Sequence, residues 1–188
     1  KELIIGPKKI KENSRNGNSY NLQPTKFKVI TNSREIKELN VVSSGDFIIA
    51  SPINIGKLEI NMAGSGNILL EKKVEGNKLE INLASSGSVV ASNIDLAGIE
   101  CSLAGSGYIQ IAGKADRAEY NLAASGNIKA YECVTGKTEC NIAGSGNIQT
   151  HTRNQLEANI VGSGNVYYKG NPTTSKSIIG SGKLKSVN

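Results

Sequence analysis

Seven glutamates recur at nearly regular spacing and form the most regular set of side chains that could do chemistry. They are Glu38, Glu59, Glu80, Glu100, Glu119, Glu139 and Glu157. Cations lie two residues before four of them, on the same side of an extended strand; they are Lys57, Lys78, Arg117 and Lys137. Calcium requires oxygens that converge on one centre, whereas these carboxylates are predicted to lie along a line. The pattern therefore favours a solvent-exposed ladder of ion pairs over a divalent-cation site.

The remaining chemical candidates are weaker. Gly180-Ser181-Gly182-Lys183 resembles the end of a phosphate-binding loop, but Leu184 occupies the Ser/Thr position and Ser177 the position of the upstream Gly. His151 is the only histidine, and with Cys101, Cys133 and Cys140 it supports neither a zinc site nor a Cys-His nucleophile pair. The sequence therefore predicts no catalytic residue, no cofactor and no metal.

The elements that carry these residues follow from a Ser-Gly repeat. Eight copies recur every 18 to 21 residues, and we predict that each forms a structural corner. The eight corners are Ser44-Gly45, Ser65-Gly66, Ser86-Gly87, Ser106-Gly107, Ser125-Gly126, Ser145-Gly146, Ser163-Gly164 and Ser181-Gly182. The residue four positions before each Gly is apolar in all eight copies, as is the residue two positions after it; Leu103 and Ile109 are one example.

Period-two alternation around each corner indicates a strand, a corner and a second strand. One repeat is too short to bury its apolar side, so it must stack on its neighbours. The predicted fold is all-β: a single-stranded, right-handed parallel β-helix (a solenoid) of about eight coils of 18 to 21 residues, each coil three-sided. Glycine suits the corner because some residues there need positive φ and because a Cβ would collide with adjacent coils.

Further columns repeat around the corner. The serines should form a hydroxyl ladder, and the residue five positions before each Gly is Asn or Ser, such as Asn121. Whether this polar column faces in or out stays open, because the following alanine column, such as Ala123, breaks the alternation. All length variation falls in one segment per coil, such as residues 71–77 or 151–154. We therefore predict that this third side shrinks to a loop in the last two coils.

The three cysteines are interpreted as small core residues. Cys101 and Cys140 share a column two coils apart, about 9.6 Å by strand spacing, which exceeds the roughly 7 Å limit for a disulfide. Cys133 lies in the variable segment and could approach Cys140 only if that side folds back.

Charge divides the chain into two parts. Nine of the 22 Lys and Arg lie in residues 1–40, and the rest of the chain is nearly neutral despite a net charge of +6. Residues 1–34 are predicted to be a basic segment or the remnant of a preceding β region, and residues 35–188 the repeat domain. The body lacks the clustered cations and stacking aromatics of a nucleic-acid binder, and no apolar run is long enough for a transmembrane segment. The chain starts at Lys1 rather than Met, so we expect any export signal to have preceded it.

Three features of the repeat region resemble a known family. The Gly-Ser-Gly-Asn-Ile repeats, the run Tyr167-Tyr168-Lys169-Gly170-Asn171-Pro172 and the final Gly180-Ser181-Gly182 resemble the putative auto-transporter adhesin family, head GIN domain, of bacterial surface proteins. The resemblance covers roughly residues 35–188. It implies an extracytoplasmic location, secreted or associated with the outer membrane or cell surface, and an adhesive role, and it supplies no catalytic residues.

Three functions stay open on this basis. The first is a non-catalytic adhesive or ligand-binding module whose surface ligand is a glycan or a protein; Tyr108, Tyr167 and Tyr168 are the candidate ligand face. The second is a structural protein that assembles with copies of itself, and a small homo-oligomer is compatible with either. The third is a polysaccharide-active enzyme, since β-helices host such enzymes. The carboxylates outside the ladder argue against an enzyme because they occupy unrelated columns and only Glu71 and Glu75 form a near-pair.

Overall fold

The computed structural model describes residues 36–42 and 44–187, so the predicted N-terminal segment, residues 1–34, lies outside the described residues. Every regular element in the described part is a β-strand. The strands are β1 (Glu38–Val41), β2 (Phe47–Ile49), β3 (Ile53–Met62), β4 (Asn67–Leu70), β5 (Val74–Leu83), β6 (Ser88–Leu103), β7 (Tyr108–Leu122), β8 (Asn127–Gly144), β9 (Asn147–Gly162), β10 (Asn165–Lys169), β11 (Thr173–Gly180) and β12 (Lys183–Ser186). The described residues thus include no helix long and apolar enough to cross a membrane.

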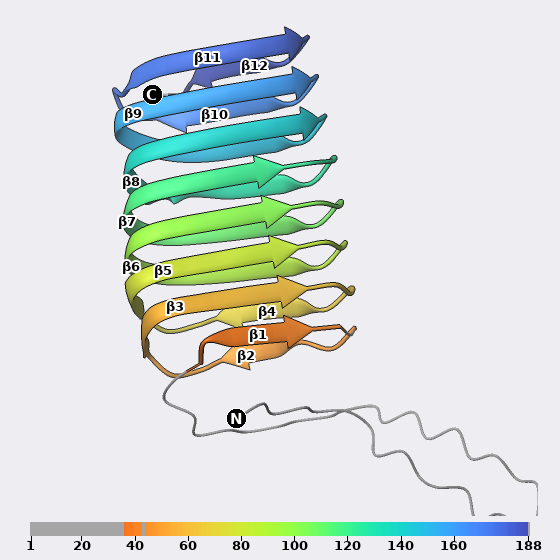
Figure 1. The fold of residues 1–188 in the computed structure, drawn as a ribbon, viewed down its shortest axis with the longest axis vertical. Coiled ribbons are helices and arrows are strands. Elements are labelled where there is room, and N and C mark those ends of the chain that lie inside the picture. Colours follow the sequence, from red (N-terminus) through yellow and green to blue (C-terminus); the bar gives the residue numbers. More distant parts are fainter. Residues whose placement is uncertain (1–35, 43, 188) are drawn as a thin grey trace, which may run out of the picture. The chain divides into compact units, whose positions relative to one another are not determined.

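The strands stack in parallel as a β-solenoid of about seven turns, which confirms the predicted fold class. The hydrogen-bonded order is β1-β3-β5-β6-β7-β8-β9-β10-β12, with β2, β4 and β11 pairing beside this path. The predicted number of coils, about eight, was the number of Ser-Gly corners. Because a turn runs from one corner to the next, eight corners correspond to about seven turns. Figure 1 shows the chain advancing from β1 to β11 with the near strands running one way and the far strands running back, in a right-handed sense.

Each turn has three sides. The chain leaves a corner along a return side, such as residues 127–130, crosses a short side, such as 133–135, and runs back along a long side, such as 137–142. In β6 to β9 the three sides belong to one continuous strand with register shifts near the bends. The outward surface of the long side is called the long face, and that of the return side the return face; the long face is nearer the viewer in Figure 1.

Equivalent aliphatic side chains stack inside the solenoid, as predicted. Leu103 pairs with Leu122, and Leu122 with Ile142, and all three are at most 3% exposed. The column after the corner behaves in the same way, with Ile109 and Ile128 fully buried. Because parallel strands repeat at about 4.8 Å, each apolar residue packs directly on the residue one turn earlier.

The C-terminal part of the core is polar in places. Thr135, Thr138, Thr150 and Thr152 are all buried, and their hydroxyls bond to one another, with 2.6 Å between Thr135 and Thr138 and 2.7 Å between Thr138 and Thr152. Mutual hydrogen bonding satisfies the hydroxyls that burial removes from water. Two of these threonines, Thr135 and Thr152, lie in the variable segment, where the repeat gives no guide.

The short side shrinks along the chain. Residues 53–55 pair with 74–76, whereas between β8 and β9 only Val134 and Thr135 pair there, with His151 and Thr152. In the next turn residues 170–172 are outside any strand. The predicted loop is therefore confirmed for the final turn and wrong for the turn before it, where β9 keeps two paired residues.

The corner glycines are required by close approach of the backbone. A Cβ on Gly146 would lie 2.2 Å from the Gly126 carbonyl oxygen, and the equivalent glycines meet the same obstacle. Among the described residues, positive φ occurs two residues before three of the C-terminal corners, at Gly144, Gly162 and Gly180; at Gly162 it is 123°. The corner serines are exposed, and Ser125 and Ser145 bond along the stack with 3.2 Å between their hydroxyl oxygens.

Candidate functional site

The glutamate column runs along the long face. Consecutive glutamates pair in register from Glu38 to Glu157. In the N-terminal turns, lysines join neighbouring rungs: the Lys57 ammonium lies 3.0 Å from the Glu80 carboxylate, and that of Lys78 lies 2.7 Å from Glu100. The Lys57 hydrogen bond lowers the pKa of Glu80, and the Glu100 hydrogen bond raises the pKa of Lys78. These turns form the ion-pair ladder that the sequence predicts.

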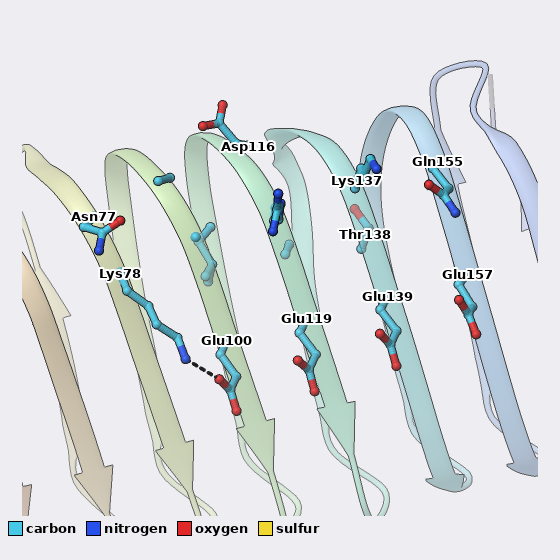
Figure 2. A pocket seen from close by; sticks show the side chains of 15 residues that line it. Asn77, Lys78, Glu100, Asp116, Glu119, Lys137, Thr138, Glu139, Gln155 and Glu157 are labelled. Atoms are coloured by element: carbon cyan, nitrogen blue, oxygen red, sulfur yellow. Dashed lines mark hydrogen bonds and ion pairs between the residues drawn. The ribbon is translucent and has the colours of Figure 1, made fainter.

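The same column changes character toward the C-terminus. There a groove of about 640 Å³, open to solvent, follows the carboxylates, and Arg117 and Lys137 line it. Figure 2 shows Glu100, Glu119, Glu139 and Glu157 in one line on successive strands, while Asp116 lies at the bend. Glu119 and Glu139 each accept a 2.9 Å hydrogen bond from an asparagine, Asn121 and Asn141 respectively. The equivalent bond from Asn61 to Glu59 is present in an earlier turn at 3.0 Å. The amide contact is therefore common to both parts of the column, and the lysine bridges distinguish the N-terminal turns.

This linear arrangement limits the chemistry that the long face can do. Residues 36–42 and 44–187 contain no cluster of three or more His, Cys, Asp or Glu side chains that could hold a metal ion. Calcium and general acid-base chemistry both need groups that converge on one point. A line of carboxylates instead offers the same acceptor at every turn.

Two columns of amides face outward and settle the question that the sequence left open. In the column before the corner, Asn141 donates to Asn121 and accepts from Asn159, with N–O distances of 2.9 and 3.0 Å. A second column directly after the corner was not singled out from the sequence, although the Gly-Asn step in the repeat marks it; there Asn165 donates to Asn147 at 3.0 Å. Stacked amides of this kind satisfy one another and hold their register.

An apolar column lies next to the first amide column, also on the long face. The alanines were expected to break the inward-outward alternation; in the structure the alternation continues, and the alanines point to solvent. The column ends in larger residues, with Val42 80%, Val161 54% and Ile179 68% exposed. Its members are Val42, Ala63, Ala84, Ala104, Ala123, Ala143, Val161 and Ile179. Five of them, Ala84 to Val161, line a shallow groove together with the amides.

The candidate tyrosines lie on the return side, where the structure separates them. Tyr108 and Tyr167 occupy outward positions, each with a lysine ammonium near its ring, at 4.8 Å from Lys129 and 5.9 Å from Lys185. Tyr168 pairs with the buried Thr150 and packs against the core, so it does not belong to the same surface.

Sequence reasoning missed Tyr131, which joins the outward tyrosines. The Lys169 ammonium lies 4.9 Å from the centre of its ring. Burial raises the pKa of the Tyr131 phenol, and the neighbouring Tyr167 phenol adds to the rise. Tyr131 lies five residues after Gly126, with the same parity as Tyr108 after Gly107, and that parity was the available signal.

The remaining candidates have structural positions. Gly180-Ser181-Gly182-Lys183 forms an ordinary corner, in which the Gly182 amide donates to the Gly162 carbonyl at 3.1 Å. Cys101, Cys133 and Cys140 are free and buried, as predicted. Burial raises the pKa of all three thiols, to about 12 for Cys133, which makes them poor nucleophiles. His151 is half-buried and pairs with Val134 in the stack.

One prediction about the carboxylates is wrong. Glu75 does not stand apart from Asp95, because the two pair in register on the short side. Lysines neutralise them: Lys73 contacts both, and the Lys114 ammonium lies 3.1 Å from Asp95. The change in segment length between these turns hid this register. Both carboxylates are about 40% exposed or more, so they form another surface ion-pair cluster.

Comparison with known proteins agrees with this architecture. A structure described as a putative lipid binding protein from Parabacteroides distasonis ATCC 8503 shares 52% identity over 94% of this chain and 72% of its own, with a TM-score of 0.88. A putative adhesin from Parabacteroides merdae ATCC 43184 shares 34% identity (81% of this chain, 64% of its own, TM-score 0.75). Another putative adhesin from P. distasonis shares 30% (80% and 64%, TM-score 0.79).

No curated protein matches the chain. The model of one family does match it, over residues 1–75 and 64–172. That coverage exceeds half of the sequence and includes seven of the eight Ser-Gly corners. The chain therefore belongs to the family described as putative auto-transporter adhesin, head GIN domain.

Proposed function

We propose that the chain is a non-catalytic binding module that acts outside the cytoplasm, at the cell surface, as part of an adhesive protein. The observation that carries this proposal is the linear arrangement of its outward polar side chains. Carboxylates and amides repeat once per turn along the solenoid and do not converge on a point. Such a surface suits multiple weak contacts with an extended partner, whereas bond cleavage needs groups gathered around one bond.

Family membership and similarity to solved structures described as putative adhesins support the same role. The solenoid itself is suited to adhesion because each turn is braced by its neighbours, so the outward groups are held in place before a partner arrives. Preorganisation of this kind lowers the entropy lost on binding.

The test is to immobilise the chain on fluorescent beads and apply them to a glycan array and to intact cell surfaces. The same glycans are incubated with the chain and assayed for new reducing ends. We expect saturable bead binding to at least one surface ligand and no new reducing ends. Release of reducing ends would make the chain an enzyme, and the absence of binding to every glycan and cell surface would refute the adhesive role.

A second candidate, binding to a lipid surface, is favoured by one specific observation. The apolar column of the long face is exposed along its whole length, with Val161 and Ile179 among its larger members, and the relative that shares 52% identity is described as a putative lipid binding protein. Flotation with phosphatidylcholine vesicles tests this candidate. Co-flotation that is lost in the variant Val161→Ser/Ile179→Ser would support it, and a chain that stays at the bottom of the gradient would exclude it.

A further inference from the structure

We propose that the return face of the C-terminal turns binds anionic polysaccharide, a chain of carboxylated or sulfated sugars. The surface consists of Tyr108, Lys129, Tyr131, Tyr167, Lys169 and Lys185 and is called the Tyr-Lys face. This inference rests on the proposed binding function and names the chemistry of its ligand.

The register of the return strands brings these residues together. Lys129 pairs with Gln149, Gln149 with Tyr167, and Tyr167 with Lys185, so the four side chains form one outward column. Tyr108 lies in the adjacent column, which continues toward the C-terminus through three asparagines to Lys183. The repeat thus places lysines and tyrosines from β7, β8, β10 and β12 on one surface.

Each tyrosine holds a lysine in place. The three ammonium groups lie 4.8, 4.9 and 5.9 Å from the ring centres of Tyr108, Tyr131 and Tyr167. A cation over an aromatic ring is attracted by the quadrupole of the ring, which restricts a side chain that would otherwise sample many rotamers. The lysines are therefore partly preorganised for an anionic partner.

The charge of this surface differs from that of the long face. The return segments from residue 108 onward carry Lys129, Lys169, Lys183 and Lys185 but a single carboxylate, Glu132. Glu132 is 78% exposed and lies 3.5 Å from Lys169. The long face, by contrast, carries the seven glutamates. An anionic ligand is consequently attracted to the return face, whereas on the long face the cations are accompanied by glutamates.

The amide column supplies contacts for neutral parts of the ligand. Asn147 donates to Asn127 at 3.3 Å and Asn165 to Asn147 at 3.0 Å. Each amide nitrogen has two hydrogens, so one N–H of each of these two donors is left over for a sugar hydroxyl. Because the column repeats at about 4.8 Å, a linear polymer along the solenoid axis meets the same donor at each turn.

Two other anionic partners, a nucleic acid and a lipid membrane, fit this surface less well. Nucleic-acid binding uses aromatic faces for base stacking, whereas here each of the three rings has an ammonium over it. A lipid requires an apolar space for its acyl chains, whereas Ile128, Ile148 and Val166 fill the interior beneath this face and are fully buried. The test therefore includes a nucleic acid and a lipid vesicle as comparison probes.

The experiment measures binding of the full chain to immobilised polygalacturonate by biolayer interferometry. Neutral dextran, vesicles containing phosphatidylglycerol and oligodeoxythymidylate are the comparison probes. The test variant is Lys129→Gln/Lys169→Gln/Lys185→Gln. The control variant, Lys37→Gln/Lys72→Gln/Lys176→Gln, removes the same charge from exposed lysines off the Tyr-Lys face. Thermal melts establish that both variants are folded.

We expect binding to polygalacturonate that weakens with salt, falls at least about tenfold in the test variant and changes less than about twofold in the control. Equal losses in the two variants would overturn the inference, because charge alone would then explain binding. Stronger binding to dextran, vesicles or oligonucleotide than to polygalacturonate would also overturn it. In either case, binding to another glycan or cell surface would leave the proposed adhesive function standing.

Discussion

At the scale of single residues, the corner glycines are set by the space between turns. The obstacle to a side chain at Gly146 is the carbonyl group of Gly126 one turn earlier, together with a Leu122 methyl group at 2.7 Å. Backbone atoms in a hydrogen-bonded stack cannot move aside cheaply. By contrast, a Cβ on Gly98, at the start of a long side, would meet nothing within 4 Å.

We therefore expect Gly146→Ala to destabilise the chain by about 1–3 kcal/mol, the usual cost of overpacking. Gly98→Ala is the matched control and should be neutral or stabilising by up to about 1 kcal/mol, because alanine restricts the unfolded chain. Urea denaturation of both variants measures the difference. Equal stabilities for the two variants would show that the turns are not packed as described.

The buried thiols make stability depend on alkaline pH. Burial keeps the thiols of Cys101, Cys133 and Cys140 protonated in the folded chain, since it raises their pKa values. In the unfolded chain they ionise near about pH 8.5. Above that pH the unfolded state binds fewer protons than the folded state, so the free energy of unfolding falls as pH rises.

We expect a loss of up to about 1.4 kcal/mol per thiol for each pH unit between about 8.5 and 10, before lysines and tyrosines ionise. Chemical denaturation at a series of pH values measures the slope, and the variant Cys101→Ala/Cys133→Ala/Cys140→Ala should lack most of it. Rapid modification of these thiols by a maleimide in the folded chain at pH 8 would contradict their burial.

At the scale of elements, the amide ladder on the long face has one internal interruption. Ser102 pairs with Asn82 on one side and Asn121 on the other. Asn82 donates an amide hydrogen bond to Asn61, and the ladder resumes where Asn141 donates to Asn121. A serine is too short to bridge the two neighbours, so the ladder is broken at β6.

Ser102→Asn should restore the ladder and stabilise the chain by about 1 kcal/mol, the net value of a typical hydrogen bond. Ser177→Asn is the control, because Ser177 has a single asparagine neighbour, Asn159, among the described residues, and should gain less. Asn141→Ala should cost about 1–2 kcal/mol. Thermal and urea unfolding measure the three variants; a Ser102→Asn gain no larger than that of Ser177→Asn would count against the ladder.

The repeat made the stacked elements predictable but not the segments between them. Leu103, Leu122 and Ile142 share one offset from the corner, so their stacking follows from counting. Glu75 and Asp95, and the buried Thr135 and Thr152, lie where turn length varies, so counting from a corner does not give their register. The direction of the asparagine column could not be predicted because the neighbouring alanines are apolar yet exposed. Hydrophobicity alone would place such small residues inside.

At the scale of the whole solenoid, two faces with different chemistry follow from one parity rule. Outward positions on the long side carry the glutamate, amide and apolar columns, while outward positions on the return side carry the lysines and tyrosines. A change at one position is therefore repeated as a line along the stack. This is how a short repeat makes an extended binding surface without a cavity.

Both faces depend on equivalent corner residues lying one turn apart, and engineered disulfides test this spacing directly. In the background Cys101→Ala/Cys133→Ala/Cys140→Ala, the pair Ser125→Cys/Ser145→Cys joins adjacent turns, whose spacing of about 4.8 Å suits a disulfide. The pair Ser106→Cys/Ser145→Cys spans two turns, about 9.6 Å, which is too far. Under mild oxidation, intact mass spectrometry should detect an intramolecular disulfide in the first variant and free thiols in the second. Equal cross-linking in both variants would contradict the stacking register and, with it, both proposed faces.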